Sequence, residues 1–306
     1  MKPIPLIGLL LAFQLLHVPP ASCQEKSIKV KSFTLALCQM NVVGGDRPAN
    51  LAHAGEMIAR AAKEGAQFVL LPEAMDLGWT DPSALSEAEP IPGGTSFSYL
   101  ADKARKHGVY VCSGLIEKAG DKVFNSAVII NPEGELILLH RKLNELGIGH
   151  PYYALGDRLN VCETEYGTIG LMICADASTG DHVIPRALAY MGADVILSPS
   201  SWAVPPDHDN NKKPYGGMWK EAYKPVAKDF RVWIASCSNV GWMTGGPWKG
   251  WKGIGCSMVI GPGGSDMLHA PYGVDADTIL YVDINPEPRP GQGTTWHDYW
   301  NGTNDN

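Results

Sequence analysis

Three residues that could form a cysteine hydrolase site each stand at the end of a strand-like run in this sequence. Glu73 follows Leu-Leu-Pro, Lys142 follows His-Arg, and Cys174 closes the apolar run Gly-Leu-Met-Ile-Cys. In α/β proteins, the carboxyl ends of strands are where chemistry is exposed. If these three strands meet at one sheet edge, the carboxylate, the ammonium and the thiol converge.

A trio of this kind supports nucleophilic attack on a carbonyl carbon. A free thiol has a pKa of about 8.5 and is mostly protonated at neutral pH. A carboxylate within hydrogen-bond reach would take that proton during the attack. Lys142 would stabilise the thiolate and, with the backbone N–H of Ala175, the oxyanion; one such donor is commonly worth about 3 kcal/mol. Glu73 would then protonate the departing amine and activate water against the thioester.

Each of these residues also has an ordinary structural interpretation. Cysteine is among the most buried residue types and usually packs as a small hydrophobe. Lys142 alone is compatible with a surface lysine at a strand end, and Glu73 with a solvated loop carboxylate. The chemical interpretation therefore depends on the three residues occurring together.

Strand-like and helix-like segments alternate over most of the chain. Apolar and β-branched runs predict strands, and apolar residues that recur every three or four positions predict amphipathic helices. We expect strands at residues 32–39, 66–71, 108–113, 125–130, 135–140, 167–174, 194–198, 232–238, 255–260 and 278–284. We expect helices at residues 50–63, 96–107, 181–191 and 217–230.

The hairpin at residues 125–140 turns at Asn-Pro-Glu-Gly and leaves no room for a helix between its strands. The sheet must therefore be mixed rather than wholly parallel. No break in composition divides residues 32–285, which we predict to form one α/β domain. Residues 286–306 begin rich in proline and glycine but carry three aromatic residues, so we expect an irregular tail that docks at an oligomer interface.

The composition is that of an ordinary globular protein, with 306 residues, 45% hydrophobic and 19% charged. The net charge of -7, with no basic cluster larger than a pair, predicts no nucleic-acid partner. Seven cysteines are present without a C-x-x-C pair. We therefore expect buried thiols, no structural zinc and no disulfide framework. We interpret Asp207-His208-Asp209 as an exposed polar loop rather than a metal site.

The first residues have the pattern of a targeting segment. Lys2 precedes an apolar stretch at residues 4–18 that is short for a membrane span, and small residues follow it up to Cys23. We predict a signal peptide at residues 1–23 and export to the periplasm or the extracellular space. Cys23 after Ala-Ser also resembles a bacterial lipoprotein acceptor, so plain cleavage and a lipid-anchored form are both open.

Several longer segments make the sequence similar to the nitrilase, or carbon-nitrogen hydrolase, superfamily. They are Leu-Pro-Glu at 71–73, Asn-Ser-Ala-Val-Ile-Ile-Asn-Pro-Glu-Gly at 125–134, His-Arg-Lys-Leu at 140–143, Gly-Leu-Met-Ile-Cys at 170–174, and Arg-Ala-Leu-Ala-Tyr-Met-Gly-Ala-Asp-Val-Ile-Leu-Ser-Pro-Ser-Ser-Trp at 186–202. Ser-Asn-Val-Gly at 238–241 and Gly-Cys-Ser-Met-Val-Ile-Gly-Pro-Gly-Gly at 255–264 follow. Their order and spacing are together specific, although each segment alone is weak.

This resemblance implies a Glu–Lys–Cys triad, which falls on Glu73, Lys142 and Cys174. It also implies a four-layer α-β-β-α sandwich with mixed sheets. It further implies that the protein uses no metal and no organic cofactor, and that it assembles into a homo-oligomer, a dimer or larger.

Residues near the triad bear on the substrate. True nitrilases of the superfamily tend to have Trp-Glu after the cysteine, whereas Ala175-Asp176 follow it here, which favours amides over nitriles. Many relatives place a second glutamate after the lysine. Glu145 is close enough for that role, but its segment matches poorly, so a loop carboxylate stays an equal alternative. His150 is a further candidate for the pocket, although we prefer to interpret it as a solvated loop histidine.

Aromatic residues should form the pocket walls. We expect contributions from Trp79, Trp202, the insert at residues 203–218 and the loop at residues 241–253, which contains Trp242, Trp248 and Trp251. A loop so rich in glycine and tryptophan predicts a lid or an aromatic entrance, and packing against a neighbouring subunit is the alternative.

These features predict an exported, amidase-like hydrolase. It would cleave a non-peptide carbon-nitrogen bond of a small linear amide or N-carbamoyl amine through a thioester on Cys174. An acyltransferase that uses the same thioester and a true nitrilase are the alternatives. A catalytically silent binding protein is the least favoured, because all three residue types of the triad are present.

Overall fold

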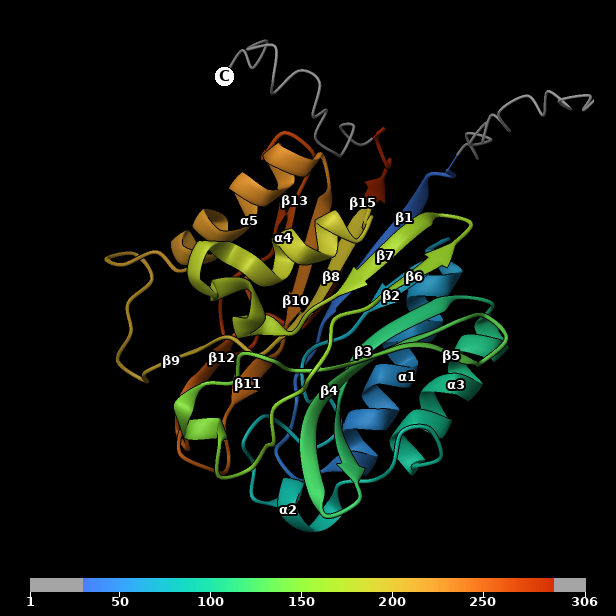
Figure 1. Ribbon diagram of the computed structural model, residues 1–306. Helices are drawn as coiled ribbons and strands as arrows, with labels where there is room; N and C mark the ends of the chain where they lie inside the picture. Colours follow the sequence, from blue (N-terminus) through green and yellow to red (C-terminus); the bar gives the residue numbers. More distant parts are fainter. Residues whose placement is uncertain (1–29, 289–306) are drawn as a thin grey trace, which may run out of the picture.

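Two six-stranded sheets form the centre of the computed structural model, which describes residues 30–288 (Figure 1). The first sheet has the order β15-β1-β2-β3-β4-β5. Its strands are β1 (Phe33–Gln39), β2 (Phe68–Leu70), β3 (Tyr110–Ala119), β4 (Lys122–Ile130), β5 (Leu136–Arg141) and β15 (Thr278–Ile284).

The second sheet has the order β14-β13-β10-β8-β7-β6. Its strands are β6 (Val161–Thr164), β7 (Gly167–Leu171), β8 (Val195–Ser200), β10 (Trp233–Ser238), β13 (Met258–Ile260) and β14 (Asp266–His269). Three short strands make a further small sheet: β9 (Ala203–Val204), β11 (Val240–Trp242) and β12 (Lys252–Ile254).

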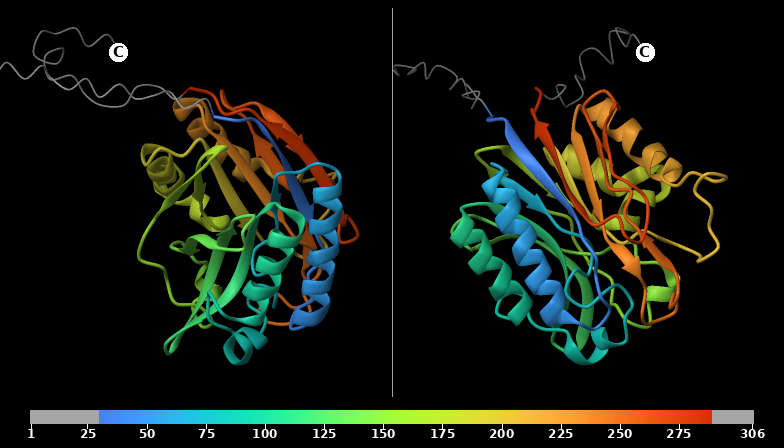
Figure 2. Two further views of the ribbon diagram at one scale, coloured as in Figure 1. Left: turned by 90° about the vertical axis from the view of Figure 1, so that its right-hand side faces the viewer. Right: turned by 180° about the vertical axis from the view of Figure 1, so that it is seen from behind.

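Helices cover the outer face of each sheet. Figure 2 shows α1 (Arg47–Lys63) and α3 (Thr95–His107) on the first sheet, with α4 (Val183–Tyr190) and α5 (Gly217–Phe230) on the other side of the molecule. The short α2 (Ser83–Glu87) and the 3-10 helices η1 (Gly147–Gly149), η2 (Cys174–Ser178) and η3 (Gly180–His182) lie in connecting segments. The predicted four-layer α-β-β-α sandwich is therefore confirmed.

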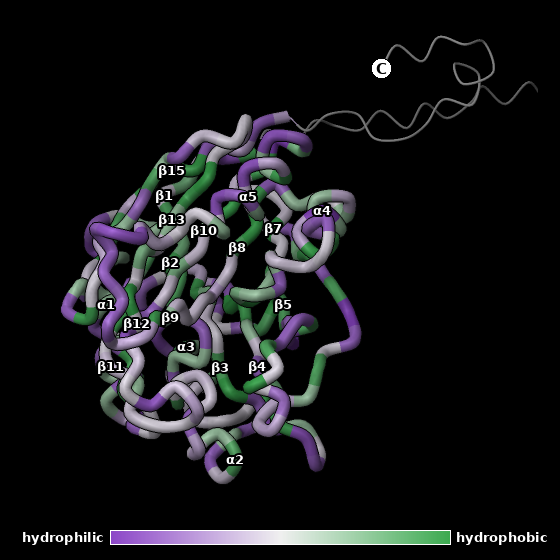
Figure 3. The backbone as a smooth tube through the Cα atoms, turned by 90° about the vertical axis from the view of Figure 1, so that its left-hand side faces the viewer, coloured by the Kyte–Doolittle hydropathy of each residue, from purple (hydrophilic) through white to green (hydrophobic). Residues whose placement is uncertain are grey.

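The alternation of side chains along a strand explains this layering. In β1, Leu35 and Leu37 belong to the core that includes both sheets, whereas Ala36 and Cys38 belong to the core beneath α1 and α3. Successive strand residues point to opposite faces, and both faces are covered here, so β1 is apolar along most of its length. The hydropathy colouring shows the same contrast between apolar central strands and largely hydrophilic outer loops (Figure 3).

Both main sheets are mixed, as the hairpin at residues 125–140 predicted. β1, β2 and β3 run parallel, while β4 and β5 pair antiparallel and β15 pairs antiparallel with β1. In the second sheet, β7, β8 and β10 run parallel, and β6 and β13 pair antiparallel with their neighbours.

Several boundaries differ from the sequence prediction for local reasons. The first helix begins at Arg47, because the side chain of Asp46 accepts the N–H of Ala49 at 3.1 Å and caps it. The strand expected at residues 167–174 ends at Leu171, and Cys174 opens a 3-10 turn. The strand expected from residue 255 begins at Met258, because Cys256 has a φ of 59°.

The predictions for residues 1–23, including Cys23, lie outside the described residues, as do Trp296, Tyr299 and Trp300 of the tail. Within residues 30–288, no helix is long and apolar enough to cross a membrane. Cys38, Cys112, Cys237 and Cys256 are buried free thiols, in agreement with the sequence prediction.

Candidate active site

Glu73 lies in the turn after β2, and both sheets hold this turn. Gly114 of β3 donates its N–H to Pro72 O and accepts the N–H of Met75, each at 3.0 Å. A Cβ at position 114 would stand 2.5 Å from the Cα of Glu73, so only glycine permits this close approach. The N–H of Glu73 donates to Ser200 O of β8 at 3.1 Å. The carboxylate is thereby fixed between the two sheets.

Lys142 follows the last residue of β5, and the register of the β4–β5 hairpin sets its position. Arg141 pairs with Ser126, and the N–H of Lys142 donates to Asn125 O at 2.9 Å. The side chain of Lys142 is 2% exposed. The lysine therefore points into the protein and not, as a surface lysine would, into solvent.

Cys174 comes from the second sheet, in the turn after β7. Its φ is 44°, a left-handed conformation that costs a residue with a Cβ on the order of 1–2 kcal/mol. The N–H of Cys174 donates to the Oγ of Ser198 at 3.2 Å, and the N–H of Met172 donates to Leu197 O at 3.1 Å. Contacts with β8 thus maintain the strained turn that presents the thiol.

The three residues therefore converge across the gap between the two sheets and not, as the sequence suggested, at one sheet edge. Lys142 Nζ is 2.7 Å from Glu73 Oε1. The thiol of Cys174 lines the same cavity as both groups, and burial and the charge of Glu73 raise its pKa while the charge of Lys142 lowers it. A base and a cation in direct contact thus share one cavity with a nucleophile.

Glu145 belongs to the same cluster. It is therefore placed as a second glutamate beside the lysine and not as a solvated loop carboxylate. Its carboxylate accepts hydrogen bonds from Lys142 Nζ at 3.0 Å, Asn125 Nδ2 at 2.9 Å and Trp79 Nε1 at 3.3 Å. Asn125 Nδ2 also donates to Glu73 Oε1 at 2.7 Å. Asn125 was not singled out from the sequence, although it lies in a segment that resembles the superfamily.

His150 is exposed and does not line the cavity beside Cys174, so of its two interpretations the structure agrees with the solvated loop position and not with the pocket. The turn η1 explains this position. A Cβ at Gly149 would lie 2.8 Å from the Cδ of Glu145, so the turn packs tightly on that carboxylate, and the next residue, His150, is exposed.

Burial and neighbouring charges set the protonation of the cluster. Burial raises the pKa of Glu73, Lys142 opposes this and Glu145 adds to it, with a net upward shift. Burial alone lowers the pKa of Lys142, but Glu73 and Glu145 outweigh it, so the pKa of Lys142 is raised. Burial and the charge of Glu73 raise the pKa of the Cys174 thiol. At rest the lysine is charged and the thiol is protonated, so attack requires the adjacent base.

A cavity of about 230 Å³ opens beside the cluster. Its lining includes Trp79 and Trp202, as predicted, and Ala175. The remaining residues of the lining are Glu73, Lys142, Leu146, Cys174, Ser178, Ser201, Ala203, Tyr215, Met218, Trp219 and Trp248. The insert and the tryptophan-rich loop thus both contribute, whereas Trp242 of that loop is 50% exposed and does not line this cavity.

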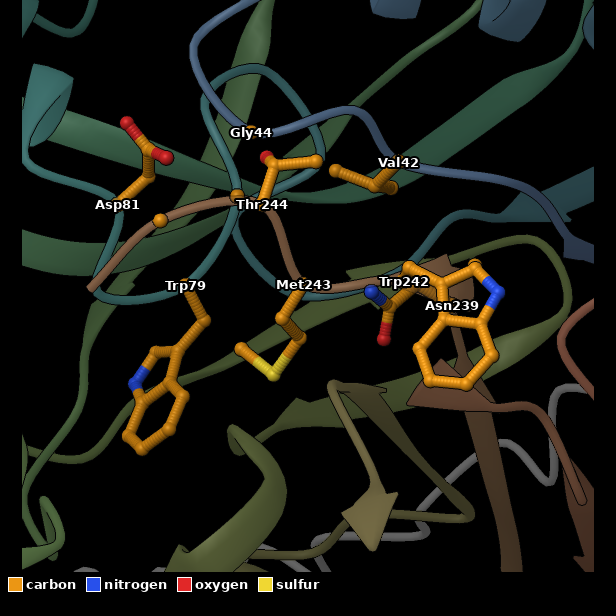
Figure 4. Close-up of a pocket in the computed structure, with 11 residues that line it drawn as sticks. Val42, Gly44, Trp79, Asp81, Asn239, Trp242, Met243 and Thr244 are labelled. Carbon is orange, nitrogen blue, oxygen red and sulfur yellow. The ribbon is translucent and has the colours of Figure 1, made fainter. Parts of the chain in front are cut away.

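Trp79 also borders a second, separate hollow (Figure 4). There its side chain and that of Met243 point to one side, while Asp81 points away from them. Among the described residues that line this hollow, Asp81 is the only ionisable one. We therefore assign the chemistry to the cavity beside Cys174.

Comparison with known proteins supports one family for this arrangement. The model of the carbon-nitrogen hydrolase family matches residues 34–288. The chain belongs to the carbon-nitrogen hydrolase family. A nitrilase from Pyrococcus abyssi is 32% identical over 232 residues, which cover 74% of this chain and 81% of the relative. The omega-amidase NIT2 of Bos taurus is 29% identical over 266 residues, with coverage of 83% and 89%.

Solved structures show the same fold. Nit3 of Saccharomyces cerevisiae, a member of the nitrilase superfamily, has a TM-score of 0.71 at 26% identity and covers 85% of this chain and 92% of its own. A carbon-nitrogen hydrolase from Helicobacter pylori has a TM-score of 0.74 at 22% identity, with coverage of 83% and 90%.

Asp176 of this carbon-nitrogen hydrolase joins the lysine segment to the cysteine turn. One carboxylate oxygen accepts the N–H groups of Leu143 and Asn144 at 3.0 and 2.7 Å. The other accepts the N–H of Ile173 at 2.9 Å and lies 2.8 Å from His140 Nε2. The side chain is fully buried. Asp176 therefore connects the segment that follows β5 of the first sheet with the turn that follows β7 of the second.

Asp176→Asn is expected to lower kcat roughly 10- to 100-fold and to reduce the free energy of unfolding by about 2 kcal/mol. The amide would present N–H groups to buried donors, which loosens the alignment of Lys142 with Cys174. Although burial raises the pKa of Asp176, the His140 contact and the backbone N–H groups hold it below the ordinary value. The contribution of the ionised Asp176 carboxylate to the free energy of unfolding is therefore present at neutral pH, and it is lost as the pH falls through that lowered pKa.

Steady-state kinetics and thermal unfolding measure both effects. Asp157→Asn is the matched control, because this carboxylate is 71% exposed, and it should change neither quantity. A kcat for Asp176→Asn equal to that of the control would show that Asp176 does not align the site.

Proposed function

We propose that this protein is a hydrolase that cleaves the carbon-nitrogen bond of a small linear amide or N-carbamoyl amine through a thioester on Cys174. The observation that carries the proposal is that one buried carboxylate, Glu73, pairs with the ammonium of Lys142 at 2.7 Å and lines the same cavity as the thiol of Cys174. The family and the amidases among its relatives support a carbon-nitrogen bond as the target.

The first half of the reaction forms the thioester and releases the amine. Cys174 Sγ attacks the carbonyl carbon as its proton passes to Glu73, and the new oxyanion lies beside Lys142 and the backbone N–H of Ala175. When the tetrahedral intermediate collapses, the carbon-nitrogen bond breaks and Glu73 gives the same proton to the leaving nitrogen. Ammonia or an amine departs.

The second half regenerates the thiol. Glu73 takes a proton from water, whose oxygen attacks the thioester carbonyl, and the carbon-sulfur bond breaks. The thiolate regains the proton from Glu73, and the carboxylic acid, or the carbamic acid of an N-carbamoyl substrate, leaves. Glu145 supports both halves, because its contact with Lys142 keeps the ammonium charged and directed at the reacting carbonyl.

The position of Asp176 supports amides rather than nitriles as substrates. The residue that stands in the position of the nitrilase-type glutamate, Asp176, is engaged by backbone N–H groups and His140 and does not line the cavity. It is therefore not placed to act on a bound nitrile. Acyl transfer to an amine or alcohol would use the same thioester and differs only in the acceptor that replaces water.

An ammonia-release screen over primary amides, N-carbamoyl amines and nitriles tests this proposal, with Cys174→Ala as the blank. We expect release from members of the first two classes, and rates with nitriles at least about tenfold lower. Ammonia release that is equal in the blank, or that is confined to nitriles, would overturn it. Addition of an amine acceptor during the screen identifies acyl transfer by the amide product that it forms.

A further inference from the structure

We propose that the cavity beside Cys174 takes a small, flat and uncharged acyl group and discriminates against acyl groups that end in a carboxylate. This inference rests on the proposed function, because it concerns the acyl half of the substrate. It follows from the walls, the size and the charges of the cavity.

Aromatic rings from distant parts of the chain form the walls. Trp202 and Trp219 stack with their centroids 4.9 Å apart and their planes at 18°. Trp79 and Trp248 lie 4.9 Å apart at 59°, and Trp248 stacks on Trp251 at 4.4 Å and 2°. Indole rings that are already held in fixed orientations favour a planar guest, which gains stacking or edge contacts without ordering the walls.

The cavity is small, and its deep end is closed. Its volume of about 230 Å³ lies below the range of roughly 300–1,000 Å³ typical of sites for drug-sized ligands. Glu73, Lys142 and Cys174 are buried, whereas Leu146 and Met218 are 38% and 54% exposed and mark the opening. A single ring or a short branched chain fits such a space.

The charges in the cavity disfavour an anionic acyl group. Among the described residues of its lining, Lys142 supplies the only positive charge. Two carboxylates already engage that ammonium, Glu73 at 2.7 Å and Glu145 at 3.0 Å. A carboxylate on the substrate would lose its hydration without gaining a cation of its own, and it would approach two charges of its own sign.

A cationic acyl group is disfavoured because it would also lose its hydration. Aromatic walls attract cations, but Lys142 Nζ already stands 5.6 Å from the centre of the Trp79 ring. Both carboxylates near the cavity, Glu73 and Glu145, already pair with Lys142, so a second cation would find no carboxylate of its own. Neutral groups have no such hydration to lose, and the apolar side chains of Ala175, Leu146 and Met218 complete a surface suited to them.

A series of amides of the form X–CH₂–CONH₂ tests the inference. The group X is phenyl in phenylacetamide, isopropyl in isovaleramide, carboxylate in malonamate and trimethylammonium in betaine amide. Each kcat/KM for ammonia release is divided by the rate of alkaline hydrolysis of the same amide, which removes differences in intrinsic reactivity. We expect phenylacetamide to lead, isovaleramide to follow, and malonamate and betaine amide to lie about 100-fold or more below phenylacetamide.

Variants of two tryptophans in the loop at residues 241–253 test whether the aromatic wall causes the preference for a planar acyl group. Trp248→Leu should lower the ratio of phenylacetamide to isovaleramide about fivefold, and Trp248→Phe should largely restore it. Trp242→Leu is the matched control, because Trp242 is exposed and lies outside this cavity. It should leave the ratio unchanged.

The possible failures are distinguishable. If malonamate or betaine amide leads the series, or if Trp248→Leu behaves like Trp242→Leu, the inference is overturned while the proposed function stands. If no amide of the series or of the wider screen acylates Cys174 or releases ammonia above the blank, the proposed function fails and the inference falls with it.

Discussion

Cys174→Ala is expected to lower kcat/KM for ammonia release by about 10⁵-fold or more, to the level of the uncatalysed reaction. The thiol is the group that bonds to the acyl carbon in the proposed mechanism, and no other described cysteine lines the cavity. Alanine keeps a Cβ, so the left-handed turn at position 174 stays equally strained. The melting temperature should therefore change by no more than about 3 °C.

Cys162→Ala is the matched control for this change. Cys162 is a half-buried free thiol on β6 and does not line the cavity. It should retain full activity. Activity that persists in Cys174→Ala, or that disappears in Cys162→Ala, would refute the assignment of the nucleophile.

Glu73→Gln is expected to lower kcat/KM by about 10²- to 10⁴-fold, because the amide cannot take the thiol proton. The fold should survive. Glutamine keeps an oxygen that accepts from Lys142 and Asn125, and Glu145 still pairs with Lys142. Pre-steady-state measurement of the first turnover should show little or no acylation, and a normal acylation burst would rule out the base role.

The pH dependence of kcat/KM gives an independent readout of the same residue. Glu73 must be ionised to act as the base, and burial raises its pKa above the ordinary glutamate value. Activity should therefore rise with pH through this raised pKa, and the acidic limb should be absent in any residual activity of Glu73→Gln. Glu145→Gln should keep the limb and move it to lower pH, because it removes a negative charge that raises the pKa of Glu73.

Periodicity predicted the helices better than the limits of the strands. Residues 217–230 form α5 with the predicted limits, because its buried residues, among them Trp219, Ala222 and Val226, recur at helical spacing. Strand β3 continues six residues beyond the predicted end to Ala119, although Glu117 and Lys118 are charged, because it pairs along all of β4. The two- and three-residue strands β9, β11 and β12 carry too little pattern to be recognised.

The site residues could be predicted individually, but their mutual arrangement could not. Strand ends identified Glu73, Lys142 and Cys174, yet nothing local in the sequence states that β2 and β5 belong to one sheet and β7 to another. Glu145 stayed open because its position depends on tertiary contacts with Trp79 and Asn125, which its own segment does not reveal. From the sequence, Asp176 was interpreted as a replacement for the glutamate that follows the cysteine in true nitrilases. Its hydrogen bonds instead give it a positioning role.

The central claim is that the acyl group is carried by Cys174. Mass spectrometry of the wild-type enzyme, quenched in acid during turnover of the best amide and then digested, tests this most directly. We predict a mass increase equal to the acyl group on the peptide that contains Cys174, its discharge as a hydroxamate when hydroxylamine replaces water, and no adduct in Cys174→Ala. An acyl group on a different residue, or turnover that yields neither adduct nor hydroxamate, would contradict the account.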